Sequence, residues 1–128
     1  MKNLILIGNN NNSINDSASY FTSAIIGFNN NNTSCKSFIY GESNITAQSA
    51  NNTYLMGESN NISNGAAYTY VIGRSNTSTN GANNNIILGK ENTVTNGVIN
   101  SYTIGNNLYN NFTKSILLGH FNAYISGQ

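Results

Sequence analysis

The sequence predicts an all-β fold, a single-stranded parallel β-solenoid, from three observations. A short apolar segment closed by glycine recurs eight times, the closing glycines are 14–19 residues apart, and turn signals stand between the copies. This spacing is too short for helical repeats, which need more than about thirty residues, but it suits one coil of stacked strands. We expect about eight coils in a single domain over residues 1–128.

Each apolar segment is a predicted strand. The segments are rich in Ile, Leu, Val and aromatic residues, which fit a pleated surface, and Ile86-Ile87-Leu88-Gly89 is typical. The series opens at Gly8, and its further corner glycines are Gly27, Gly41, Gly57, Gly73, Gly89, Gly105 and Gly119. Their spacing predicts an irregular, bulged or capping first coil over 8–27, regular coils over 27–119 and a terminal half coil over 119–128.

The strands are apolar on both faces. The residues two before and one before each glycine point to opposite sides of a strand, and a strand that is apolar on both sides is buried on both. One face fills the coil, and the other needs a cover, most simply a second copy of the chain. The sequence therefore predicts an obligate homo-oligomer whose core and seam are Ile25, Ile26, Ile39, Leu55, Met56, Val71, Ile72, Ile87, Leu88, Ile104, Leu117 and Leu118.

Asparagine stands three residues after the corner glycines, with Leu108 as the one exception in eight. Stacked Asn side chains hydrogen-bond from one layer to the next. We expect a ladder of this kind in a second, short polar strand on the solvated side of the coil. Its predicted members include Asn44, Asn60, Asn76, Asn92 and Asn122.

Asn-Gly pairs follow seven and eight residues after three of the corner glycines, at 64–65, 80–81 and 96–97. Asn-Gly is the strongest short turn signal, because both residues accept positive φ. These pairs predict a second corner in each coil.

The composition excludes several classes of function. Charged residues make up 7% of the chain and the net charge is +1, so nothing favours binding to nucleic acid or to an anionic membrane. No apolar run reaches membrane-spanning length, and the N-terminal run is too short for a signal peptide. We expect no membrane insertion, leader or anchor. Cys35 is the single cysteine, which excludes an intrachain disulfide and a Cys-based metal site.

Few residues are candidates for catalysis. Glu42 and Glu58 are expected one coil apart, near the roughly 5 Å separation of a retaining glycosidase, but residues after a corner glycine occupy an exposed rim. Arg74 should lie one coil above Glu58 and form an exposed ion pair. His120 has no clustered partners for a metal. We expect no enzyme, cofactor or metal, and a carbohydrate-active solenoid is kept as an alternative.

The aromatic residues fall into two groups. Those three before a corner glycine share the side of the residue just before the glycine, which favours a buried or interface stack over a sugar-binding stripe; they are Phe38, Tyr54, Tyr70 and Tyr102. The others are better candidates for recognising a partner, and they are Tyr20, Phe21, Tyr109, Phe112, Phe121 and Tyr124.

The repeat resembles the head repeats of trimeric autotransporter adhesins of the YadA type. The resemblance covers the chain from Leu4 to Gly127 and is clearest over 69–84 and 85–100, where an apolar pair, a glycine, two variable residues, a small polar residue and a second glycine corner follow one another. It implies a left-handed parallel β-roll assembled as a homotrimer. Here Asn replaces the family's Ser or Ala after the glycine, and most coils have 16 residues instead of 14.

Similar rolls occur in bacteriophage fibres, which assemble in the host cytoplasm without a signal peptide. The resemblance therefore implies a structural or adhesive module of a virion, in a tail or head fibre. Other virion proteins at one end and a host-surface glycan or protein are the expected partners. The alternative is the head fragment of a bacterial adhesin at the cell surface.

Overall fold

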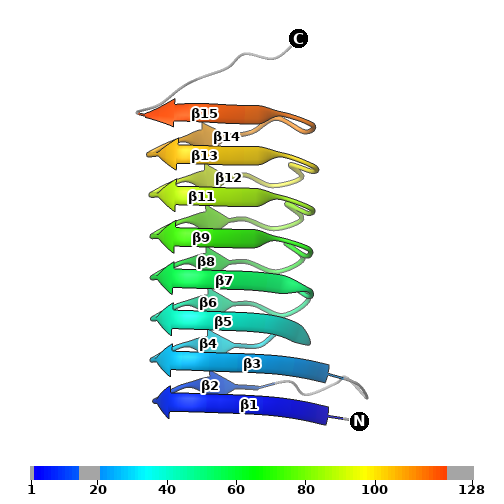
Figure 1. The fold of residues 1–128 in the computed structure, drawn as a ribbon. Helices are drawn as coiled ribbons and strands as arrows, with labels where there is room; N and C mark the ends of the chain where they lie inside the picture. The colour runs from blue at the N-terminus through cyan, green and yellow to red at the C-terminus, as the bar shows by residue number, and fades with distance from the viewer. Residues whose placement is uncertain (1, 15–20, 121–128) are drawn as a thin grey trace.

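The chain folds into a parallel β-solenoid, all-β as predicted (Figure 1). The structure, a computed structural model, describes residues 2–14 and 21–120. In these residues, eight long strands form one parallel sheet and seven short strands form a second. One short strand lies between each two successive long strands, so the described chain makes about seven full turns.

The strands of each sheet stack in chain order. The long strands are β1 (Lys2–Asn9), β3 (Phe21–Phe28), β5 (Lys36–Glu42), β7 (Thr53–Glu58), β9 (Tyr70–Arg74), β11 (Ile86–Lys90), β13 (Tyr102–Asn106) and β15 (Ile116–His120). The short strands are β2 (Asn12–Ser13), β4 (Asn31–Asn32), β6 (Ile45–Thr46), β8 (Asn61–Ile62), β10 (Thr77–Ser78), β12 (Thr93–Val94) and β14 (Tyr109–Asn110).

The corner glycines are aligned from one coil to the next, even across the longer first interval, where Gly8 pairs in register with Gly27. The extra residues of that interval, 15–20, and all of the terminal half coil after His120 lie outside the described residues, as does Asn122. The predicted irregularity of the first coil therefore stays a prediction.

The residues two before each glycine point into the solenoid. From β3 to β15 they are at most 3% exposed, and they are Ile25, Ile39, Leu55, Val71, Ile87, Thr103 and Leu117. Leu6 occupies the same position on β1 and is 46% exposed, because β1 has a neighbouring strand on one side only. The residues one before each glycine point outward, so the structure separates the predicted core from the predicted seam.

The Asn ladder runs through the interior, whereas we expected it on the solvated side. Asn60 is fully buried; its Nδ2 donates to Asn44 Oδ1 at 3.0 Å and to the Gly73 carbonyl at 2.9 Å. Its Oδ1 accepts from the backbone N–H and the Nδ2 of Asn76, at 3.1 and 3.0 Å. These bonds satisfy the amide completely, which is what permits its burial. The short strands begin one residue after the ladder, contrary to our expectation that they contain it.

The second corner is a turn, as the Asn-Gly pairs indicate. In the turn at 63–66, the Ala66 N–H donates to the Ser63 carbonyl at 3.1 Å. Gly65 has a φ of 73°, while Asn64 is not among the residues with positive φ. This combination is typical of a type II turn. Only the glycine of the pair uses the left-handed region.

Among the residues two before the corner glycines, one is polar, and its side chain has a hydrogen-bond partner. Thr103 replaces the aliphatic residue at this position, and its Oγ1 accepts from Asn110 Nδ2 at 2.9 Å, with both residues buried. Thr103→Val keeps the shape but leaves this amide proton unpaired. We expect the free energy of unfolding to fall by about 1–2 kcal/mol, measured by urea denaturation. A more stable variant would show that the hydrogen bond contributes nothing.

Candidate functional site

The outward side of the eight-stranded sheet is the most distinctive surface of the molecule. Two positions of each long strand project from it, three residues and one residue before the glycine, and none carries a charge. We call these residues the apolar face. They are Ile5, Ile7, Ala24, Ile26, Phe38, Tyr40, Tyr54, Met56, Tyr70, Ile72, Ile86, Leu88, Tyr102, Ile104, Ile116 and Leu118.

The apolar face is open in the single chain. Tyr70 is 52% exposed, Ile72 43% and Leu118 62%. Seven gaps of about 4.8 Å between strands make the face about 34 Å long. Soluble monomers rarely expose a continuous apolar patch of this kind, and large ones mark sites of association. The predicted core and seam residues that stand one before a corner glycine all lie on this face.

The aromatic residues of the face stack on one another. The ring centroids of Phe38 and Tyr54 are 4.9 Å apart and those of Tyr54 and Tyr70 are 6.0 Å apart, with small interplanar angles. Such pairs follow from the strand spacing and rigidify the face. Part of the surface of each stacked ring is therefore covered by its neighbour in the column.

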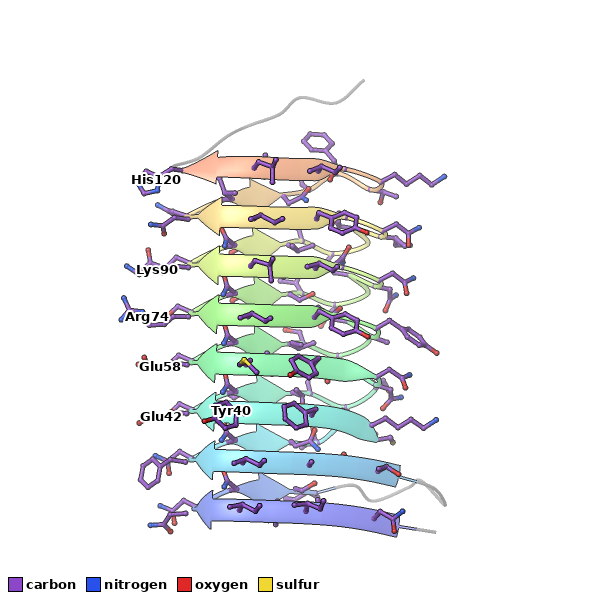
Figure 2. The ribbon with its side chains drawn as sticks, viewed as in Figure 1. Tyr40, Glu42, Glu58, Arg74, Lys90 and His120 are labelled. Carbon is purple, nitrogen blue, oxygen red and sulfur yellow. The ribbon has the colours of Figure 1, made fainter. Side chains whose placement is uncertain are left out.

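Two rims, polar except for Phe28 and Tyr68, border the apolar face. The residue after each corner glycine forms the glycine rim, and the residue five before it forms the opposite rim. Figure 2 shows Glu42, Glu58, Arg74, Lys90 and His120 projecting from one edge of the sheet, while Tyr40 lies on the face itself. An apolar centre with a polar border is the usual anatomy of a protein interface.

The charged residues of the glycine rim do not form an active centre. Glu42 and Glu58 are register partners on neighbouring strands, as expected, and both are exposed. The predicted ion pair between Glu58 and Arg74 is wrong. They are also register partners, but the salt bridge among the described residues joins Lys90 and Glu91 at 2.9 Å.

The described residues contain no group of three or more His, Cys, Asp or Glu side chains placed to hold a metal ion. His120 is exposed at the end of β15, and Cys35 is half-buried beyond β4. Of the aromatic residues outside the face, Tyr109 is 44% exposed and Phe112 is half-buried. The side chains of Tyr20, Phe21, Phe121 and Tyr124 lie outside the part that the structure describes.

No known protein family, curated protein or solved structure matches this chain. Within residues 2–14 and 21–120, no helix has the length and apolarity that crossing a membrane requires.

Two features of the backbone at the surface were not predicted from the sequence. The residue two after each corner glycine from Gly8 to Gly105 has a positive φ, including Glu91 at 56°. The opposite rim also has a positive φ from β7 onward, and Tyr68 is the one aromatic residue there. Recurrent Asn at both positions, joined by Ser two after the glycine, is the clue, because Asn tolerates this conformation and Tyr does not favour it.

Proposed function

We propose that this protein is a non-enzymatic structural fibre module that assembles through its apolar face into a homotrimer. The observation that carries the proposal is the continuous uncharged face across all eight long strands. Three copies around one axis bury this face completely, which a single chain leaves in water. The resulting rod is stiff, because its coils are held together by two sheets and by a ladder of buried amides that is interrupted at Leu108.

The finer description follows the family resemblance. It favours a left-handed roll in a bacteriophage virion, in a tail or head fibre, with other virion proteins at one end and a host-surface glycan or protein as a receptor. The head of a bacterial surface adhesin uses the same rod and is the second candidate. Both are supported by the scarcity of charge and by the Asn, Ser and Thr residues on the other sides of the coil.

The assembly is tested by mass in solution. We expect light scattering to give about 41 kDa, three times the 13.8 kDa of the chain. Ile72→Asn places a polar group on the apolar face and should reduce the mass to that of a monomer while the circular dichroism spectrum stays that of a β-protein. Tyr109→Asn changes an exposed residue of a short strand and should leave the mass unchanged. A folded monomer in the unmodified protein would refute the proposal.

A substitution on the other side of the same sheet should act differently. Ile87 is fully buried inside the solenoid, so Ile87→Asn buries an unpaired amide and removes apolar packing. We expect the free energy of unfolding to fall by about 3 kcal/mol or more, measured by urea denaturation at a fixed protein concentration. If Ile87→Asn dissociates the oligomer without unfolding the chain, the assignment of the two faces is wrong.

A further inference from the structure

A rotation axis along the rod fixes which residues of neighbouring chains meet. Rotation about that axis changes no height, so each coil lies level with the same coil of the next chain. With the apolar face turned to the axis, the glycine rim of one chain then borders the opposite rim of its neighbour. This step depends on the proposed self-association, and the residues on the two rims can be compared coil by coil.

The coil that contains β5 has opposite charges on its two rims. Lys36 begins β5 and Glu42 ends it, so both belong to one strand. Six residue steps of about 3.3 Å separate them by about 20 Å within a chain. They are therefore too far apart to pair with each other, but in a parallel assembly Glu42 of one chain lies beside Lys36 of the next.

The coil that contains β9 has Arg74 on one rim and Tyr68 on the other. Tyr68 is 56% exposed and has a φ of 53°, where Asn52, Asn84 and Asn100 stand in other coils. A bulky residue in this conformation is strained, and such strain often accompanies a functional contact. A shallow depression lined by Tyr68, Tyr70, Asn84, Asn85, Ile86 and Tyr102 lies at the same rim.

We infer that the chains associate in parallel and in register, with Glu42 bound to Lys36 and Arg74 stacked on Tyr68 of the neighbouring chain. Across the eight long strands, this alignment places no two Lys, Arg, Asp or Glu side chains of the same charge opposite each other, and His120 faces Lys114. An antiparallel dimer instead brings Glu42 beside Lys90 and Glu58 beside Arg74, so the charged residues of the glycine rim have partners in that arrangement as well. It leaves Lys36 and Tyr68 opposite Asn84 and Asn52, so the two unusual residues of the opposite rim have no charged partner.

Disulfide cross-linking distinguishes the two arrangements. In a background with Cys35→Ser, we expect the pair Lys36→Cys and Glu42→Cys to form covalent trimers on oxidation, because the two thiols of one chain are too distant to react. The pair Glu42→Cys and Lys90→Cys should stay uncross-linked, and so should each single variant. Covalent dimers from the 42/90 pair would overturn the inference in favour of an antiparallel dimer.

The mass of the same samples before oxidation separates this inference from the proposed function. An oligomer in which 36/42 does not cross-link refutes the rim contacts but preserves self-association, whereas a monomer refutes both.

Tyr68→Asn tests the second contact without relying on cross-linking. Asn suits the positive φ better than Tyr, so the isolated chain should become more resistant to urea. The assembly loses the ring beneath the Arg74 guanidinium and should dissociate at about tenfold higher protein concentration. Opposite signs in the two measurements are expected. Unchanged dissociation, or a variant less stable as a monomer, would overturn the role given to Tyr68.

Discussion

Gly73→Ala should prevent the chain from forming a stable solenoid. A Cβ atom at this position would lie 1.8 Å from the carbonyl oxygen of Gly89 in the next coil. That oxygen belongs to the backbone of a paired strand and accepts from Asn76 Nδ2 at 2.8 Å, so it has little freedom to move. The φ of 140° adds strain for any residue with a side chain.

We expect Gly73→Ala to cost about 4 kcal/mol or more in the free energy of unfolding, as overpacking and backbone strain combine. Urea denaturation and circular dichroism measure this loss. Gly97→Ala is the matched control, since a Cβ there meets nothing within 4 Å and the φ of 75° costs about 1–2 kcal/mol. Equal losses in both variants would show that coil contact at the corner is unimportant.

Asn76→Asp should have the next largest effect, although the two side chains have nearly the same shape. Asn76 Nδ2 donates to Asn60 Oδ1 at 3.0 Å and to the Gly89 carbonyl at 2.8 Å. A carboxylate would direct an oxygen at both acceptors and lose both bonds. It would do so at a site that is fully buried.

An uncompensated buried charge costs about 3–5 kcal/mol, and we expect a loss of that size at neutral pH in thermal or urea unfolding. Asn80→Asp introduces the same charge at an exposed turn residue and should change stability by less than about 0.5 kcal/mol. If the two variants are equally stable, the amide ladder does not hold the coils together.

The period of the fold could be predicted because it depends on local rules. The spacing of the corner glycines, the β-branched residues before them and the Asn-Gly pairs each specify backbone geometry within one coil. All of them agree on stacked short strands. The hydrogen-bonding of Asn60 and Asn76 from coil to coil also follows from position, since equal register brings equal side chains together.

The inside of the coil was harder to predict than its outline. Ile72 and Ile87 are equally apolar, so alternation alone does not tell which faces inward; the direction in which the chain turns at Gly73 and Gly89 decides it. Asn60 was expected in water because isolated amides avoid burial. Its ladder removes that cost by pairing donors with acceptors, which is a property of the stack and of no single coil.

The rims were predicted least well, because surface energies are small. Glu58 and Arg74 are aligned, but an exposed pair is worth at most about 1 kcal/mol and does not fix two long side chains. The strain at Tyr68 has no sequence signature except its departure from Asn. A residue of this kind is recognised only when the φ of its position is known.

The exposure of Leu6 has a consequence for how the rod fails. Each coil is stabilised by contacts with the coils directly before and after it, so stability is close to a sum of nearest-neighbour terms. The coil that contains β1 has one such term where interior coils have two. Since β15 also has a single neighbouring long strand, unfolding of this chain should start at its end strands, and a longer rod gains resistance in its middle without gaining any at its tips.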